Sequence, residues 1–572
     1  MLPDRHPIVY RFLRLGFRLF VRPLLPRLKR YYEAYKAIMP DGAYNAFANS
    51  NNNFCLVEHP IKNNPLISVV VPIYNPRHVH LLEMVYSVVN QHYENWELIL
   101  VNASTNKKSR AQVTECSSID TRIRVVSIEK NLGISENTNA GIKVATGDYI
   151  AFLDHDDVLH PCALHSVVET LQKAKVPDLI YTDEDKITEK GDRFFGPHCK
   201  PDWSPDLLRN VNYINHLTVI RSEMVKKVGG LRTICNGAQD YDLLLRVIDK
   251  CGPAIKHVPR ILYHWRSTEG STAKNINTKD YVFKAGTKAL RDHIKRNNIL
   301  AKPSHISGKP GFYELVYEPS DFSIIIGQVS ISKEQACAKW IDKLLDQPRE
   351  KEISVELIIG EWYKKFAKEY PNLPIKYVTD GVKNYWQSAV ELAAYPVCVC
   401  FKIAAVPTIR YGLSRLAAVA RDSKHTAVSP VVISENETIL DAGVVGSDSL
   451  PKKLFEGYRL GRYTYFGNTD WVRNVNDLTT NIIAIDTSRL KHFMNNEVRS
   501  YQQAATLHGL LPATAADGSR LVVWAHTPFE YKGLLRPDIG NSYHNSQLFK
   551  LTPVVTMHMD NWGEGYAREP EK

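Results

Sequence analysis

Short apolar runs alternate with amphipathic segments from residue 66 onward. The run LISVVVP at residues 66–72 is rich in β-branched residues and ends in proline, as expected of a buried parallel strand. Similar strand-like runs lie at residues 96–102, 122–128, 148–154 and 178–185. Helical spacing of apolar residues occurs between these runs, after the first strand and at residues 136–146 and 162–174. This alternation predicts an α/β fold with a mostly parallel sheet and right-handed crossovers.

Polar clusters follow four of the predicted strands. They lie at residues 72–75, 102–104, 154–157 and 183–185. In sheets of this kind, ligands bind beyond the carboxyl ends of the strands. We therefore expect the four clusters to meet at one edge of the sheet and to form a ligand site there.

The same pattern starts again near residue 320. Strand-like runs lie at residues 322–326, 355–360, 373–378 and 395–402, in the same order as in the first half. A chain of 572 residues has the length for two to four domains. We interpret the second half as another copy of the first architecture.

Three carboxylates lie within four residues in the segment Asp154, His155, Asp156 and Asp157. Clustered carboxylates repel one another, and a hard divalent cation that bridges them to a diphosphate would offset this repulsion. An acidic loop that caps the helix starting near Pro161 is the structural alternative. The phosphate-binding motifs of P-loop proteins and of dinucleotide-binding folds do not occur nearby.

Two further segments carry candidate chemistry. Asp240 begins a helix-like stretch, where it could cap the helix or serve as a general base for an acceptor hydroxyl. In the segment 263–266, His264 could be a core histidine or could supply an imidazole to a metal, and Arg266 could contact phosphate.

The order and spacing of these motifs over residues 66–300 resemble the family 2 glycosyltransferases with the GT-A fold, most of all the bacterial subgroup that builds O-antigens, capsules and other surface polysaccharides. The motifs that carry the resemblance are VVVPIYN (69–75), SVVNQHYENWELILVNAS (87–104), NLGISENTNAGIKVATGDYIAFLDHDD (131–157), IYTDEDKI (180–187), CKPDWSPDLL (199–208), GAQDYDLLLR (237–246) and ILYHWR (261–266). The resemblance implies a GT-A catalytic domain, followed by a second, degenerate GT-A-like domain.

The resemblance also assigns roles by position. Asp154, Asp156 and Asp157 match the DxD element that holds Mn²⁺ or Mg²⁺ on the donor diphosphate, Asp240 matches the catalytic base, and His264 matches a position that can complete the metal site. The donor-binding positions implied are Pro72, Tyr74, Asn75, Asn102, Asp154, Asp183, Asp185, Trp203 and Arg266. Asn102 departs from the family, which usually has Asp there; an amide can still pair with a pyrimidine edge. The choice of nucleotide therefore stays open.

These assignments predict a metal-dependent, inverting glycosyltransferase that moves a sugar from a UDP- or dTDP-sugar to a hydroxyl of a lipid-linked or growing surface glycan. The segment 398–408 of the second half has no carboxylate where the DxD element would fall, which argues against a second transferase activity there. The alternative is a non-catalytic glycan-binding or scaffold protein of a polysaccharide assembly complex, and this role is the one expected for the second half. Self-association or a complex with other polysaccharide enzymes would fit either role.

The positive charge of the chain is concentrated at its N-terminus. The net charge is +11, and residues 1–30 hold eight Lys and Arg against one Asp. Residues 8–22 would form a basic amphipathic helix, suited either to an anionic membrane surface or to packing on the protein's own core. Because the rest of the chain is nearly balanced, a nucleic-acid-binding surface is not indicated.

The expected organisation is an amphipathic segment (1–40), a linker (41–65), the catalytic domain (66–310), the degenerate domain (320–535) and a C-terminal tail (536–572). The nine scattered cysteines contain no CxxC pair and predict free thiols in a reducing compartment. The predicted location is cytoplasmic and peripheral, with residues 5–30 at the inner face of a bacterial membrane.

Overall fold

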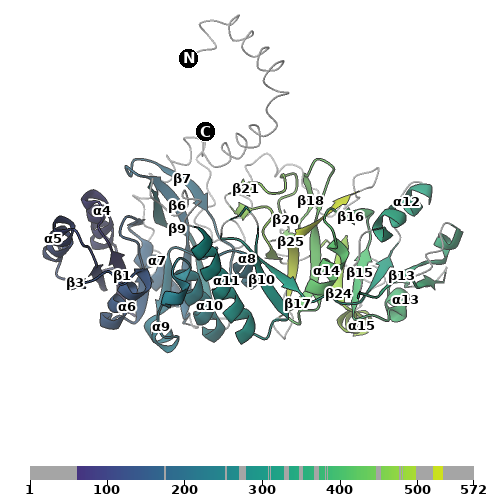
Figure 1. The fold of residues 1–572 in the computed structure, drawn as a ribbon, viewed down its shortest axis with the longest axis horizontal. Coiled ribbons are helices and arrows are strands. Elements are labelled where there is room, and N and C mark those ends of the chain that lie inside the picture. Colours follow the sequence, from purple (N-terminus) through teal and green to yellow (C-terminus); the bar gives the residue numbers. More distant parts are fainter. Residues whose placement is uncertain are drawn as a thin grey trace, which may run out of the picture.

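The computed structural model describes residues 61–531, except 173–175, 252–253, 269–278, 307, 310, 328–333, 347–351, 366–372, 380–381, 383, 446–451, 465, 476–477, 480 and 497–518. The predicted N-terminal segment, residues 41–60 of the linker and the C-terminal tail fall outside the described residues. Two mixed sheets lie side by side along the long axis of the molecule, one from each half of the chain (Figure 1).

The first sheet has the strand order β3-β2-β1-β4-β8-β6-β9-β5, and β7 pairs with β6. Its strands are β1 (Ile67–Ile73), β2 (Trp96–Asn102), β3 (Ile123–Ser127), β4 (Tyr149–Phe152), β5 (Val158–Leu159), β6 (Leu179–Thr188), β7 (Phe194–His198), β8 (Thr218–Arg221) and β9 (Ile255–Ser267). The four strands β1 to β4 are parallel, as predicted. The whole sheet is mixed, because β8 runs antiparallel to both β4 and β6.

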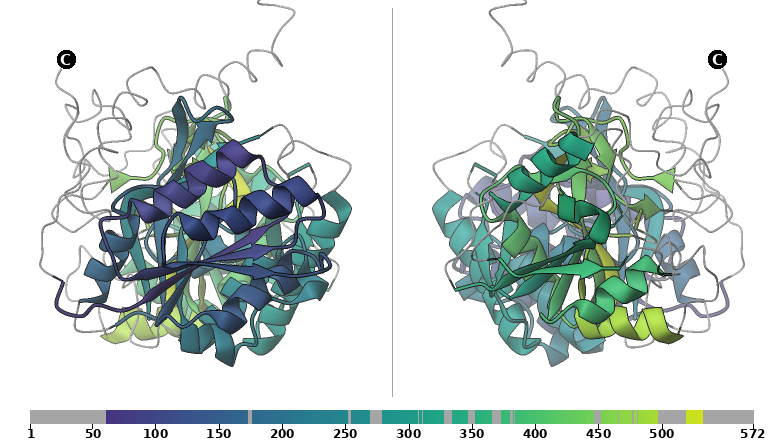
Figure 2. Two further views of the ribbon diagram at one scale, coloured as in Figure 1. Left: turned by 90° about the vertical axis from the view of Figure 1, so that its left-hand side faces the viewer. Right: turned by 90° about the vertical axis from the view of Figure 1, so that its right-hand side faces the viewer.

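Helices cover both faces of this sheet (Figure 2). They are α4 (His78–Val89), α5 (Lys107–Glu115), α6 (Ile134–Val144), α7 (Ala163–Leu171), α8 (Pro205–Asn210), α9 (Ser222–Lys227), α10 (Gln239–Cys251) and α11 (Lys279–Arg296), with short 3₁₀ turns at Cys116–Ser118 and Thr233–Cys235. Alternate residues of β1 pack in two separate cores: Val69 and Val71 lie against α4 and α7, whereas Val70 lies against α6. Burial on both faces explains why β1 is apolar along nearly its whole length.

A hairpin of β10 (Ala301–His305) and β11 (Tyr313–Tyr317) lies between the two sheets (Figure 1). The second sheet has the order β14-β13-β12-β15-β24-β17-β25-β16. Its strands are β12 (Phe322–Ile326), β13 (Val355–Gly360), β14 (Ile375–Val378), β15 (Val397–Phe401), β16 (Ala405–Pro407), β17 (His425–Ile433), β24 (Ile482–Asp486) and β25 (Arg520–Tyr531), with β18 (Ile439–Asp441) and β23 (Arg473–Val475) added beside β17 and β25.

The remaining elements of the second half are smaller. They are α12 (Glu334–Leu345), α13 (Tyr385–Leu392), α14 (Gly412–Ala420), α15 (Thr487–Asn496), the 3₁₀ turn Glu361–Lys365 and the two-stranded pairs β19 (Val444–Val445) with β20 (Lys452–Lys453) and β21 (Tyr463–Thr464) with β22 (Gly467–Asn468). In the described part of the chain, no helix combines the length and the apolar composition needed to cross a bilayer.

The two sheets share their topology and a buried polar network. In the first sheet, Ser68 donates to Glu97 Oε1 at 2.7 Å, and Arg124 pairs with Glu97 Oε2 at 3.3 Å. In the second sheet, Ser323 donates to Glu356 Oε1 at 2.6 Å, and Lys376 pairs with Glu356 Oε2 at 2.8 Å. The repeated network supports the interpretation of the second half as a second copy.

Two expectations need correction. Strand β6 continues to Thr188 because it pairs with both β7 and β9, so Asp183 and Asp185 lie within a strand and do not follow its end. Among the described cysteines six are free thiols, but Cys162 is disulfide-bonded, so the prediction that all the thiols are free is wrong.

Candidate active site

The acidic loop after β4 is anchored from β9. Asp157 is 1% exposed, and its two carboxylate oxygens accept hydrogen bonds from the Tyr263 hydroxyl at 2.5 Å and from the backbone N–H of Arg266 at 2.7 Å. Burial raises the pKa of Asp157 well above its usual range, and the nearby charges of Asp154 and Asp156 add to this rise. A cation bound nearby would stabilise the charged form of Asp157, which burial and the neighbouring carboxylates disfavour.

A histidine that the sequence reasoning did not select completes this cluster. His216 lies two residues before β8, and its ring stacks on Tyr263 with centroids 4.5 Å apart. Asp154, Asp157 and His216 each place one ligand atom in a group whose members all lie within 4.8 Å of one another. Two carboxylates and one imidazole suit a divalent metal, the carboxylates favouring Mg²⁺ or Mn²⁺.

His216 carries a strongly shifted pKa. Burial by itself would lower it, but the hydrogen bond and charge of Glu184, with the charges of Asp154 and Asp157, outweigh burial and raise the pKa of His216 to about 9. The raised pKa reflects the negative charge that Glu184, Asp154 and Asp157 place around the ring. A divalent cation bound at the cluster would offset the same charge.

A buried ion pair holds the segment that carries His216. Lys200 is fully buried; it donates to Glu184 Oε2 at 3.0 Å, to the Ile214 carbonyl at 2.6 Å and to the carbonyl of His216. Burial by itself would raise the pKa of Glu184. Lys200 and the neighbouring histidines outweigh burial and hold the pKa of Glu184 well below its ordinary value. Nothing in the local sequence marks Glu184 or Lys200, because their contact depends on the pairing of β6 with β7, which brings Lys200 beside Glu184.

Asp240 lies at the start of α10 and reaches solvent. Its Oδ2 atom accepts a hydrogen bond from the Asn212 side chain at 3.0 Å. Desolvation by the surrounding protein raises the pKa of Asp240; a bond from the Tyr241 backbone and the charge of His216 lower it, and the charge of Asp154 raises it. The carboxylate therefore lies within electrostatic range of the metal-ligand cluster, and its raised pKa suits proton abstraction.

His264 lies apart from this cluster. Tyr263 faces Asp157 and His216, so the next residue along β9 points to the opposite face of the sheet. There His264 Nδ1 pairs with Asp185 Oδ1 at 2.6 Å, and within the described residues its buried Nε2 has no hydrogen-bond partner. The structure brings Asp154, Asp157 and His216 together, and His264 with Asp185 forms a separate pair.

Arg266 and Asp183 are engaged within the protein. The Arg266 side chain is 1% exposed and donates to the Asp156 carbonyl at 2.6 Å, to the Glu189 carbonyl at 3.1 Å and to Glu83 Oε2 at 2.6 Å. These bonds shape the acidic loop and direct the guanidinium away from solvent. Asp183 is fully buried, and its Oδ1 accepts from the backbone N–H of Lys200 at 2.7 Å.

The loops after β1 and β2 are joined by hydrogen bonds where the nucleobase of the donor is expected to bind. Asn75 adopts a left-handed conformation (φ 45°), and its side-chain oxygen accepts from the backbone N–H groups of Thr105 and Asn106, each at 3.1 Å. Pro72 lies half-buried near the end of β1, before this turn, and Tyr74 is 47% exposed and can meet a ligand.

Two other predicted donor-binding side chains face inward. Asn102 is fully buried; its amide donates to the Arg110 carbonyl at 3.0 Å and accepts from the backbone N–H of Ser104 at 3.2 Å. Trp203 is half-buried against the core and is less open than an aromatic platform for a sugar ring would be.

Residues 68–229, which span β1 to β8 and include the acidic loop and His216, match the family model described as Glycosyl transferase family 2. The first half of the chain carries a glycosyltransferase family 2 domain.

Curated relatives align with this same part of the chain. An uncharacterized protein of Sinorhizobium fredii, y4gI, is 43% identical over 45% of this chain and 28% of its own length. The O-antigen biosynthesis protein RfbC of Myxococcus xanthus is 37% identical over 41% of this chain and 18% of its own length. The chain therefore spans less than a third of either relative. Among solved structures, a mannosyltransferase of Pyrobaculum calidifontis in complex with GDP-Man and Mn²⁺ is 16% identical, with a TM-score of 0.33, over 44% of this chain and 71% of that one.

The second sheet lacks the chemistry of the glycosyltransferase family 2 domain at equivalent positions. Tyr149 pairs with Ile67 and Arg221 in the first sheet, as Val397 pairs with Phe322 and Asp486 in the second. Positions at the same sequence distance from these paired residues are equivalent in the two sheets. The second sheet then has Lys402 in place of Asp154, Ala405 in place of Asp157 and Asn481 in place of His216, and the strand pairing places Glu530 at the position of His264. Burial lowers the pKa of Lys402 to about 8. An amine thus takes the place of a carboxylate of the acidic cluster.

Proposed function

We propose that the chain transfers a sugar, with inversion, from a UDP- or dTDP-sugar to a hydroxyl of a lipid-linked or growing surface glycan. The observation that supports this proposal most is the cluster of Asp154, Asp157 and His216, with Asp240 within electrostatic range of it, in a glycosyltransferase family 2 domain. The name of the O-antigen biosynthesis relative supports a surface polysaccharide as the product.

The residues of the cluster divide the work. Asp154, Asp157 and His216 would hold Mn²⁺ or Mg²⁺, with Asp156 beside them; the cation would neutralise the charge of the departing nucleoside diphosphate. Asp240 would accept the proton of the acceptor hydroxyl as its oxygen attacks the anomeric carbon from the side opposite the leaving group. Tyr263 and Arg266 hold the acidic loop in shape, as their bonds to Asp157 indicate.

We assign the second half a non-catalytic role, which is the scaffold alternative applied to that half alone. The replacement of the carboxylates by Lys402 and Ala405 favours this assignment. The peripheral membrane location depends on residues 5–30, which lie outside the described residues, and it stays a prediction.

Calorimetry with UDP and Mn²⁺, followed by a screen of nucleotide sugars for hydrolysis and transfer, tests the proposal. Asp154→Ala is expected to abolish metal-dependent UDP binding. Asp240→Asn is expected to keep UDP binding and to lower turnover by about 10² to 10⁴-fold, the usual contribution of a general base. Lys402→Ala is the matched control and should bind UDP as the wild type does. Turnover of Asp240→Asn near the wild-type value would refute the assignment of the base.

A further inference from the structure

Side chains of the second half of the chain bind the first turn of α8 in the glycosyltransferase domain. Asp206 of α8 is 4% exposed and accepts hydrogen bonds from Asn474 Nδ2 at 2.7 Å and Arg520 Nε at 3.0 Å, and His425 Nε2 lies 3.1 Å from its other oxygen. Burial would raise the pKa of Asp206, but Arg520 and His425 outweigh it and hold the pKa well below its usual range. Asn474, Arg520 and His425 belong to the second half of the chain, and Arg209 of α8 itself also pairs with Asp206 at 2.8 Å.

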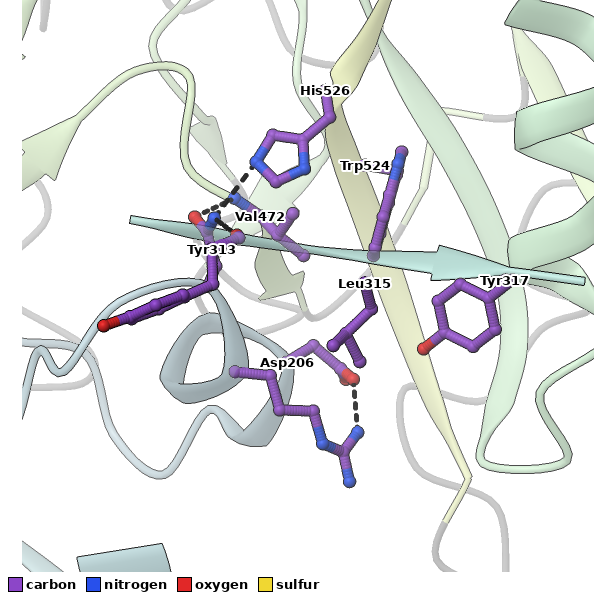
Figure 3. A pocket seen from close by; sticks show the side chains of 9 residues that line it. Asp206, Tyr313, Leu315, Tyr317, Val472, Trp524 and His526 are labelled. Atoms are coloured by element: carbon purple, nitrogen blue, oxygen red, sulfur yellow. Dashed lines mark hydrogen bonds and ion pairs between the residues drawn. The ribbon is translucent and has the colours of Figure 1, made fainter. Parts of the chain in front are cut away.

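The last turn of α8 is held in the same way. The Asn210 side chain donates to the Tyr313 carbonyl at 2.5 Å and lies 3.0 Å from His526 Nε2, and its oxygen accepts from the backbone N–H of Val472 at 3.2 Å. Figure 3 shows these residues around a cavity between the two halves. The cavity measures about 10 Å³, room for about one water molecule, so the contact is closely packed.

The segment that leaves α8 leads directly into the candidate active site. Asn212 lies two residues after the helix and donates to Asp240 Oδ2 at 3.0 Å. His216, four residues further on, belongs to the metal-ligand cluster. One short segment thus reaches both the base and the metal ligands.

A second path joins α8 to the base. The hydroxyl of Tyr241, the neighbour of Asp240, donates to the Leu208 carbonyl of α8 at 2.7 Å. The Tyr241 ring also stacks on Tyr313 of the interdomain hairpin, with centroids 5.8 Å apart and planes 13° apart. A displacement of α8 would therefore move Asp240 from two directions.

We propose that the second half of the chain is a positioning element for catalysis. Through Asn474 and Arg520 it fixes α8, and α8 fixes Asn212 against the carboxylate of Asp240. The inference rests on the proposed function for the role of Asp240, and on the structure alone for the coupling between the halves. In this view the second copy lost its metal ligands and kept the architecture because its surface sets the geometry of the first copy. A misplacement of about 1 Å can cost up to about 10²-fold in rate, so a small shift suffices.

Steady-state kinetics and hydrogen exchange of full-length variants test this inference. Arg520→Ala and Asn212→Ala are expected to lower kcat about tenfold or more and to leave the donor KM and the affinity for UDP with Mn²⁺ within about twofold of wild type. Arg520→Lys should restore part of kcat. Arg459→Ala removes an exposed ion pair with Glu437 in the same half (2.8 Å) and serves as the matched control, with wild-type kcat.

Hydrogen exchange separates this inference from the proposed function, because it does not require activity. In Arg520→Ala, amide exchange should become faster in residues 205–216 and 239–243 and stay unchanged in β1 and β2. Unchanged exchange in these segments, or a wild-type kcat in Arg520→Ala, would overturn the inference. Faster exchange across the whole molecule would also overturn it, because the contact would then only stabilise the fold. If the wild type itself transfers no sugar, the proposed function fails, while local exchange still decides the coupling.

Discussion

Asp206→Asn removes one negative charge from the contact between the two halves and keeps the size of the side chain. The Asp206 side chain is 2% exposed, and those of its partners Arg209 and Arg520 are 10% and 17% exposed. The substitution removes the negative charge of Asp206 from beside both guanidinium groups, which are largely buried. It also places an N–H₂ group, which cannot accept hydrogen bonds, where one of the two carboxylate oxygens accepted them.

The expected cost follows from these contacts. Removal of one partner from a buried ion pair typically costs about 3–5 kcal/mol, because the remaining charge stays desolvated. The amide oxygen of Asn can still accept one or two of the bonds, and Arg520 reaches some solvent. We therefore expect a loss of about 3 kcal/mol in the free energy of unfolding at pH 7.

Chemical denaturation of the full chain measures this loss, with Glu437→Gln as the control. Glu437 is in an exposed pair with Arg459, so its substitution should cost less than about 1 kcal/mol. The pKa of Asp206 is depressed in the folded protein, so its stabilising contribution is complete above the unfolded pKa of about 3.9 and is lost as the pH falls through the folded pKa. The difference between wild type and Asp206→Asn should therefore shrink below about pH 4. The reasoning would be refuted by a loss under about 1 kcal/mol at pH 7. It would also be refuted if the difference in the free energy of unfolding between wild type and Asp206→Asn did not change with pH.

Three further predictions concern the site and the N-terminus. Because the pKa of Asp240 is raised, kcat/KM should fall on the acid side at a pH above about 3.9, the value for an ordinary Asp; a pH–rate profile flat down to pH 4 would contradict this. Tyr263→Phe removes the hydroxyl that donates to Asp157 and should weaken Mn²⁺ affinity by about 10 to 100-fold in calorimetry, and an unchanged affinity would show that this bond is not needed. Deletion of residues 1–30 should abolish sedimentation with anionic liposomes, whereas unchanged sedimentation would favour a helix packed on the protein's own core.

The sequence predicted the elements of the first half closely because their signals are local. Strand β2 matches the predicted run at residues 96–102, and the other predicted strands up to residue 154 differ from the observed ones by one or two residues at their ends. The strand containing Asp183 and Asp185 extends three residues further, because β7 and β9 pair with it. Such pairing depends on residues far away in the chain, and no local pattern reports it.

The sequence suggested the carboxylates of the candidate site but not His216. Asp154 and Asp157 stand out in the sequence because they cluster after an apolar strand. His216 has no such signal; it reaches the acids because Lys200 and Glu184 bind the backbone of its segment. His264, the histidine that the motif suggested, lies apart from that cluster because side chains alternate along β9 and Tyr263 takes the face of the acids.

The sequence by itself determined that the chain has two copies of one α/β architecture and that the acidic cluster after the fourth strand occurs in the first copy, with no carboxylate at residues 398–408 of the second. Both features are visible in short stretches of the sequence: apolar periodicity specifies strands and helices, and clustered carboxylates are evident from the residue types themselves. The tertiary structure decided which side chains meet, because strand register and the facing of each residue depend on long-range pairing. It also placed the second copy against α8, next to the segment that holds Asp240. That contact joins residues more than 260 positions apart, such as Ser204 and Asn474, and only folding brings them together.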